Sequence, residues 1–141
     1  VQNAQIIGRM QCWQSNPEII LDVAHNAQSV EQLANWLAQN PKPTSAVFCA
    51  LKDKDIAAMI VQMQPYITHW SVGVLSEPAD RVCNRADLQA IFSKQLKDTD
   101  YSIFDSVASA FIDAKQNQVV GSRIVVFGSF HTLEAIMKLP Q

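Results

Sequence analysis

Three polar side chains follow an apolar run near the start of the chain, and their types suit the binding of a nucleotide. Asp22, His25 and Asn26 come just after the run 19–21, where a helical pattern begins. In open α/β sheets, ligands bind beyond the carboxyl ends of the strands, where helix N-termini also direct unpaired N–H groups outward. A carboxylate accepts hydrogen bonds from ribose hydroxyls, while imidazole and amide groups reach a base, a phosphate or a second substrate. We therefore expect a nucleotide site here, with Asp22 as an exposed strand-end carboxylate.

A second polar turn follows the last apolar run of the chain. Gly128 allows a tight turn, Thr132 is expected to cap the next helix, and Ser129 is expected to expose its hydroxyl at the same edge. Because parallel strands end at one edge, His131 and His25 either approach each other or serve only as helix caps and solvated groups. Ser129 and His131 are too close in sequence to be taken as a catalytic pair, and a GxSxG pattern is absent. A hydrolase is therefore disfavoured.

Two charged features have both a functional and an ordinary interpretation. Arg9 reads as a surface arginine unless a neighbour gives it a role. Lys52, Asp53 and Asp55 belong to a charged turn after the second predicted strand, and Asp55 is the expected N-cap of the next helix. This turn is either a solvated connection or, since it shares an edge with Asp22, a place where charges meet phosphate, metal or a partner domain.

The hydrophobic pattern predicts the sheet that positions these turns. Five apolar runs alternate with amphipathic helical patterns, at 19–23, 46–51, 70–75, 101–104 and 124–127. Strands this apolar, separated by helices of about ten residues or more, pair in parallel with both faces covered. The segment 9–13 is expected to add an edge strand, taken as antiparallel although its sequence fixes no direction. The predicted fold is α/β, a Rossmann-like three-layer sandwich with a mostly parallel sheet of about six strands.

The start of the first helix is predicted from two further residues. Ser29 and Gln32 have the spacing of a capping box, with Ser29 as the N-cap. The chain opens on Val1 rather than methionine, which suggests a domain cut from a longer protein.

Composition excludes several classes of partner. A chain of 141 residues fits one domain, and a net charge of −2 without a basic stripe gives no support to nucleic-acid binding. No apolar stretch approaches the ~20 residues that cross a bilayer, so no membrane association is expected. The three cysteines, at 12, 49 and 83, are odd in number and unpatterned, which fits a reducing, cytoplasmic setting.

Several cofactor signatures are missing. The turn after residue 21 holds no glycine, so a GxGxxG fingerprint is absent and an NAD-dependent enzyme is disfavoured. A GxxxxGK[ST] loop is also absent, so if ATP binds, another part of the protein must hold its phosphates. The histidines are dispersed and no CxxC pair occurs, so no metal ligands are assigned.

Four segments, taken together and in order, resemble a known family. They are Gly8-Arg9-Met10-Gln11, LDVAHN at 21–26, ALKDKD at 50–55 and VFGSFHT at 126–132. They resemble the C-terminal domain of the folylpolyglutamate synthase/dihydrofolate synthase family, within the Mur ligase superfamily, and the resemblance runs from 8 to 139. It implies that 1–141 is a single domain, the C-terminal glutamate ligase domain of a larger two-domain enzyme.

The resemblance also implies a reaction. In this family ATP phosphorylates a carboxylate, the amine of L-glutamate attacks the acyl phosphate, and Mg²⁺ offsets the phosphate charge. The substrate is dihydropteroate or folate, in folate biosynthesis and polyglutamylation. The phosphate-binding loop and the Mg²⁺ ligands are expected in the N-terminal domain, so the isolated chain is expected to be inactive.

Site roles are carried over residue by residue. The residues implied to contact the nucleotide are Arg9, Asp22, His25 and Asn26. Asp22 would bind the ribose, and His25 would lie at the junction with glutamate as the catalytic residue. Ser129 and His131 would bind the substrate, and the 52–55 turn is expected to close against the N-terminal domain. Ala27 stands where the family has proline, which loosens the first helical turn without removing a contact.

Two alternatives remain open from the sequence. One is a non-catalytic, nucleotide-binding regulatory module that uses the same strand-end turn. The other is a Mur-type ligase domain for another amino acid, because most residues that select the substrate lie outside this chain.

Overall fold

The computed structural model describes residues 11–139 except 16, 53, 77–78 and 98. Over these residues the chain forms one six-stranded sheet, in which β1 pairs antiparallel with β2 and the other four pairings are parallel. The strands, in spatial order, are β1 (Gln11–Ser15), β2 (Glu18–Leu21), β6 (Arg123–Phe127), β3 (Thr44–Phe48), β4 (His69–Gly73) and β5 (Asp100–Phe104). The predicted α/β sandwich with an antiparallel edge strand is confirmed. Residues 9–10 of the predicted edge strand lie outside the described residues.

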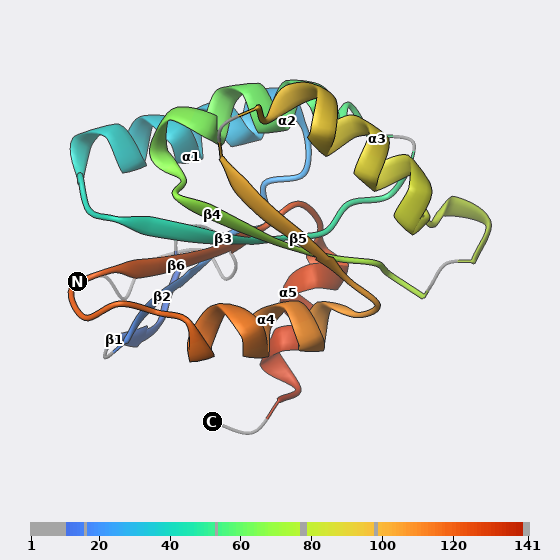
Figure 1. Cartoon of the computed structure of the whole chain (residues 1–141). Helices are drawn as coiled ribbons and strands as arrows, with labels where there is room; N and C mark the ends of the chain where they lie inside the picture. Colours follow the sequence, from blue (N-terminus) through green and yellow to red (C-terminus); the bar gives the residue numbers. More distant parts are fainter. Residues whose placement is uncertain (1–10, 16, 53, 77–78, 98, 140–141) are drawn as a thin grey trace.

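Helices cover both faces of the sheet, and Figure 1 shows the three layers. One face carries α1 (Ala27–Gln39), α2 (Ile56–Met63) and α3 (Arg85–Gln95). The other face carries α4 (Val107–Gln116) and α5 (Phe130–Met137). Two short 3₁₀ turns, η1 (Gln64–Tyr66) and η2 (Ala79–Arg81), complete the described elements.

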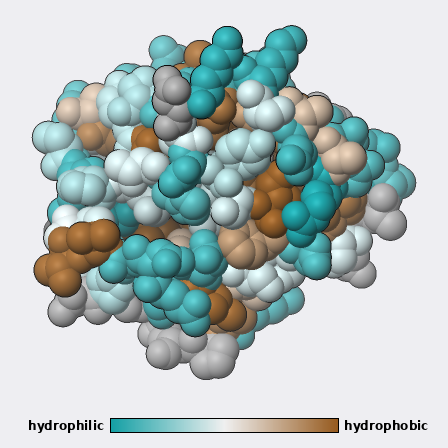
Figure 2. All heavy atoms as spheres, viewed as in Figure 1, coloured by the Kyte–Doolittle hydropathy of each residue, from teal (hydrophilic) through white to brown (hydrophobic). Residues whose placement is uncertain are grey.

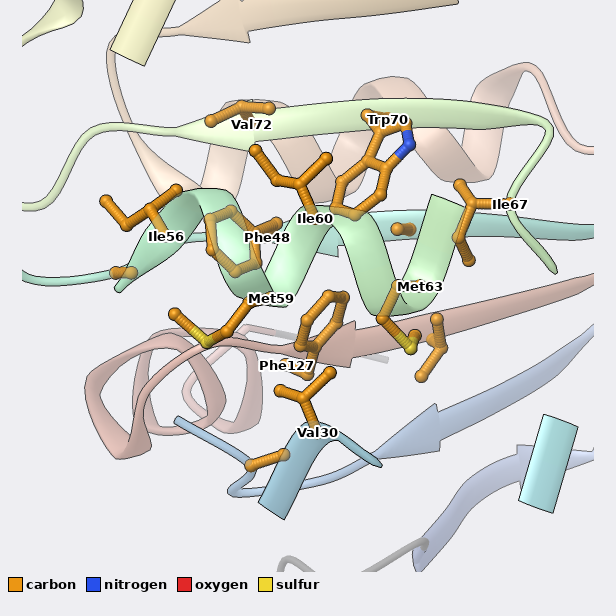
Figure 3. Close-up of a cluster of buried hydrophobic side chains, with 14 of the residues drawn as sticks. Val30, Phe48, Ile56, Met59, Ile60, Met63, Ile67, Trp70, Val72 and Phe127 are labelled. Carbon is orange, nitrogen blue, oxygen red and sulfur yellow. The ribbon is translucent and has the colours of Figure 1, made fainter. Parts of the chain in front are cut away.

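Each inner strand is buried on both sides, which explains its uniformly apolar sequence. On β6, Val125 and Phe127 pack toward α1–α3, whereas Ile124 and Val126 pack toward α4 and α5. Figure 3 shows part of the core between the sheet and α1–α3, where Phe48, Trp70 and Phe127 lie against the side chains of α2. Four aromatic rings meet there with centroids 5.0 to 6.0 Å apart: Phe48, Trp70, Phe92 and Phe127. Burial of this apolar area is the main force that holds the layers together.

Three observed strands end before the apolar runs that predicted them. β2 ends at Leu21 rather than at Val23, β3 ends at Phe48 although residues 49–51 are also buried, and β4 ends at Gly73 rather than at Leu75. An apolar run reports burial rather than strand pairing, so it overestimates strands that lead into buried loops.

The first helix also begins earlier than predicted, and its N-cap is Asn26 rather than Ser29. The side chain of Asn26 accepts a hydrogen bond from the N–H of Ser29 at 2.8 Å, and Ser29 Oγ accepts from the N–H of Asn26 at 3.3 Å. This reciprocal pair satisfies two N–H groups at the helix start. The predicted pair of Ser29 with Gln32 was therefore wrong by one turn.

The surface is polar over much of the face seen in Figure 2, where hydrophobic residues form separate patches. Among the described residues, the exposed large hydrophobic side chains are Val61, Ile112, Val119, Val120 and Met137. Within the same part of the chain, no helix has the length and apolar character needed to span a membrane.

Candidate functional site at the carboxyl edge of the sheet

The sheet order places two neighbouring loops on diverging paths. β2 and β6 are adjacent and parallel, but β2 continues into α1 on one face whereas β6 continues into α5 on the other. The same divergence occurs between β6 and β3, because β3 leads to α2. Such switch points at the carboxyl edge are where open α/β sheets bind ligands.

Hydrogen bonds hold the two diverging loops together. The N–H of Gly128 donates to the carbonyl of Ala24 at 2.8 Å, and the N–H of Asp22 donates to the carbonyl of Val126 at 3.0 Å. The structure therefore brings the predicted turn 22–26 and Ser129 to one edge, although residues 24 and 128 are far apart in the sequence.

Asp22 is buried, which corrects the expectation of an exposed carboxylate. The residue is only 5% exposed, and Oδ1 accepts the N–H of Ala24 at 2.7 Å. Aspartate side chains readily bond to a backbone N–H two residues further on, which closes a compact turn. The carboxylate thus shapes the loop in addition to any contact with a ligand.

His25 and Asn26 are exposed on the same turn. His25 Nδ1 lies 3.0 Å from the carbonyl oxygen of Val23, and the backbone N–H of His25 donates to Ser29 Oγ at 3.1 Å. When Nδ1 donates to that carbonyl, Nε2 carries the lone pair that accepts a proton or a hydrogen bond. In that tautomer, the contact with Val23 orients the ring and Nε2 is the nitrogen that accepts.

Ser129, rather than Thr132, is the residue that caps α5, and both residues are buried. Ser129 is 4% exposed and is the N-cap of α5, where Oγ accepts the N–H of Thr132 at 3.3 Å. Thr132 instead donates through Oγ1 to the carbonyl of Cys49 at 3.1 Å. The predicted exposed hydroxyl of Ser129 is wrong, because Oγ bonds to the first turn of α5 and the residue is buried. The link from Thr132 to the end of β3 spans 83 residues and leaves no local signal in the sequence.

The other predicted residues lie on different parts of the edge. Asp55 is the N-cap of α2 and accepts the N–H of Ala58 at 3.1 Å, as predicted. Lys52 is exposed, and its backbone N–H donates to the carbonyl of Arg81 at 2.9 Å. His131 lies half-buried in the first turn of α5. Arg9 and Asp53 lie outside the described residues.

One buried thiol lies beneath this edge. Burial raises the pKa of Cys49 to about 12, so its thiol is protonated at neutral pH and is not a nucleophile. In the part of the chain that the structure describes, no group of three or more His, Cys, Asp or Glu side chains is placed to hold a metal ion.

The fold and its switch-point loops match a known class of ligase domain. The chain belongs to the family described as Mur ligase, glutamate ligase domain, which matches residues 8–130. Its curated relatives are dihydrofolate synthase/folylpolyglutamate synthases. The protein of Buchnera aphidicola subsp. Schizaphis graminum is 30% identical over 99% of this chain and 32% of its own length, and that of Escherichia coli K12 is 29% identical over the same shares. The chain thus spans about a third of the length of these relatives.

Solved structures of similar enzymes agree with this placement. A bifunctional folylpolyglutamate synthase/dihydrofolate synthase from Yersinia pestis CO92 superposes with a TM-score of 0.82 and 32% identity, over 96% of this chain and 31% of that one. An enzyme of the same name, with Mn, AMPPNP and L-glutamate bound, gives a TM-score of 0.82 at 32% identity, over 96% of this chain and 32% of that one.

Proposed function

We propose that this chain is the C-terminal domain of a two-domain, ATP-dependent ligase that joins L-glutamate to dihydropteroate or folate. The observation that best supports this proposal is the pair of hydrogen-bonded loops after β2 and β6. These loops hold the turn 22–26 and Ser129 at the switch point. The family match and the names of the relatives support the reaction class. An enzyme similar to this chain binds AMPPNP and L-glutamate, which supports both ligands.

The residues proposed to contact the nucleotide differ in the support they have from the structure. His25 and Asn26 are exposed and carry donor and acceptor atoms, so they fit direct contact. Asp22 is proposed for the ribose hydroxyls from the family resemblance, because a carboxylate accepts hydrogen bonds from hydroxyl groups. Arg9 is assigned to the nucleotide from the family resemblance.

Ser129 and His131 are proposed to bind the incoming glutamate from the first turn of α5. Since the hydroxyl of Ser129 is buried as a cap, its contribution is to fix the helix start, where backbone N–H groups attract a carboxylate. His131 lies one residue into the same turn and is proposed to contact the same substrate.

His25 is proposed as the catalytic residue. Its Nδ1 is held at 3.0 Å from the carbonyl of Val23, which orients Nε2 to accept the proton that the glutamate amine loses on amide formation. When bound, ATP supplies the phosphoryl group that activates the acceptor carboxylate. A similar enzyme holds Mn, and we propose Mg²⁺ in that position with its ligands in the N-terminal domain.

We also propose a cytoplasmic location, where ATP is available. Cys49 and Cys83 are buried thiols rather than halves of a disulfide, which supports a reducing compartment.

A titration of the 141-residue chain tests the nucleotide and glutamate contacts. Magnesium-AMPPNP and L-glutamate are added separately, and backbone amide shifts are followed. We expect shifts at residues 22–26 with the nucleotide and at residues 128–131 with glutamate. His25→Ala should reduce the nucleotide response without lowering the melting temperature, whereas Gln28→Ala, at another exposed position nearby, should leave it unchanged.

The reaction itself is tested on the chain joined to its N-terminal domain. ATP- and glutamate-dependent formation of a folate product supports the proposal. Product formed only with a different amino acid would favour the Mur-type alternative, and nucleotide binding with no product from any amino acid would favour the regulatory module. If neither ligand shifted the backbone amides and the joined protein formed no product, the proposal would be overturned.

A further inference from the structure

Arg123 is a buried cation at the amino edge of the sheet, opposite the loops described above. It is the first residue of β6 and is only 3% exposed. Nε and Nη2 donate to Thr44 Oγ1 at 3.2 and 3.1 Å, and Nη2 also donates to the carbonyl of Asn40 at 2.8 Å. The guanidinium carbon lies 5.0 Å from the ring centroid of Trp36. The guanidinium is thus held in one place by neutral groups.

The charge around Arg123 is not balanced. Among the described residues, no carboxylate lies within ion-pair distance of its guanidinium, and Glu18, its register neighbour on β2, pairs with Lys42 instead. Burial lowers the pKa of Arg123, and the more distant charge of Glu18 raises it. Among the described residues, Arg123 and Lys42 against Glu18 leave a local net charge of +1, close to the partial negative charge at the C-terminal end of α1. Buried charges are costly unless they are paired.

This cation opens onto a groove of about 330 Å³ between the end of α1, the start of β3 and η1. Arg123 and Lys42 lie in its lining, and Nη1 of Arg123 makes no hydrogen bond within the described part of the chain. The apolar part of the lining includes Leu37, Pro41, Pro43, Pro65, Tyr66 and Ile67. Apolar walls with a few convergent polar groups are the usual composition of a small-molecule site.

We propose that this groove binds a small organic monocarboxylate. The N–H groups of Nε and Nη2 are already bonded to Thr44 and Asn40, so the two N–H groups of Nη1 are the donors left for a carboxylate. A single negative charge on the ligand matches the local net charge of +1. The apolar body of the ligand lies against the prolines and Tyr66. The volume is at the low end for ligand sites, which selects an acid with one ring or a short chain. This site is separate from the carboxyl edge and does not depend on the proposed ligase reaction.

Benzoate is the probe for this site, and benzamide, which has nearly the same shape without the charge, is its control. The ¹⁵N-labelled chain is titrated with each at constant ionic strength, and sodium chloride and inorganic phosphate are titrated separately. We expect saturable shifts at the backbone amides of Thr44, Ile67 and Thr68 with benzoate, and none with the other three.

Three variants test whether benzoate binds in the groove. Ala38 is exposed and lines the groove, so Ala38→Trp should fill it and weaken benzoate binding by about tenfold or more. Ala90→Trp adds the same bulk at an exposed position of α3 outside the groove and should leave binding unchanged. Lys42→Gln removes one of the two cations and should weaken benzoate binding. Since Arg123 also supports Asn40 and Thr44, the variants at 38 and 42 carry the test.

Four results would overturn the proposal. Equal binding of benzamide would reduce the site to an apolar groove, and equal responses to chloride or phosphate would make it a general anion site. Benzoate shifts that survive Ala38→Trp would place binding elsewhere. A linear response with no saturation to about 20 mM would mean that the charge of Arg123 serves only to fix Asn40 and Thr44.

Discussion

Gly128 lies against the main-chain carbonyl of Cys49 so closely that a β-carbon on Gly128 would stand 2.1 Å from that oxygen. Its φ of +118° is also one that side-chain-bearing residues rarely adopt. These two constraints allow the β6 loop to pass beside the end of β3 and reach Ala24. The position therefore requires glycine for the closeness of the backbone as well as for its conformation.

Gly128→Ala is expected to destabilise the chain by about 2–5 kcal/mol, because backbone strain and steric overlap add. Gly121 is the matched control: its φ is +85°, but a β-carbon at this position would have nothing within 4 Å among the described residues. Gly121→Ala should therefore cost only the strain, about 1 kcal/mol. Urea unfolding of both variants measures the difference, and equal losses would show that contact with Cys49 is not a constraint.

Asp22→Ala is expected to lower the free energy of unfolding by about 1–3 kcal/mol, because the N–H of Ala24 loses its acceptor. If the carboxylate were exposed, as the sequence predicts, this change would weaken nucleotide binding more than folding. Since the carboxylate is buried, both properties should fall. Asp22→Asn keeps an acceptor and should recover much of the stability, whereas Glu31→Ala, at an exposed position of α1, should change it by less than about 0.5 kcal/mol. An unchanged unfolding midpoint for Asp22→Ala would contradict the observed turn.

Asn26→Ala is expected to destabilise the chain by about 1 kcal/mol, because the first turn of α1 loses its cap. Asn26→Asp retains the acceptor and should restore the stability. Thermal unfolding followed by circular dichroism provides the measurement. If Ser29→Ala proved much more harmful than Asn26→Ala, the cap would lie at Ser29, as the sequence first indicated.

The thiol of Cys49 should make stability fall at alkaline pH. Burial raises its pKa in the folded chain from 9.0 to about 12, so the unfolded chain releases this proton first as the pH rises. The contribution of the Cys49 thiol to the free energy of unfolding is complete below about pH 9 and is lost between about pH 9 and 12. Over that range the free energy of unfolding falls by up to about 1.4 kcal/mol per pH unit.

Urea unfolding at a series of pH values from about 8 to 10.5 checks this dependence. Cys49→Ala should show a shallower decline than the parent chain, whereas Cys12→Ala, which removes an exposed thiol, should follow the parent. Burial also raises the pKa of Cys83, and that contribution is common to all three proteins. Identical slopes for the parent and Cys49→Ala would mean that the thiol does not titrate differently on unfolding.

The sequence predicts the layers and the edge that carries the site, but not the state of each side chain there. A strand that is buried on both faces needs apolar residues along its length. The apolar runs therefore identified the parallel strands and placed the turns after β2 and β6 correctly. The burial of Asp22 and Ser129 follows instead from a choice among nearby backbone partners. Spacing cannot resolve that choice, because several polar side chains in each turn are able to cap.

The middle position of β6 has a consequence for how the chain acquires its structure during synthesis. β2 and β3 have no pairing with each other, because β6 separates them and bonds to both. Of the described strands, β6 is also the last to leave the ribosome. Until it emerges, the two earlier strands present unpaired edges of the kind that invite aggregation. Completion of the sheet therefore waits on its most recently made strand.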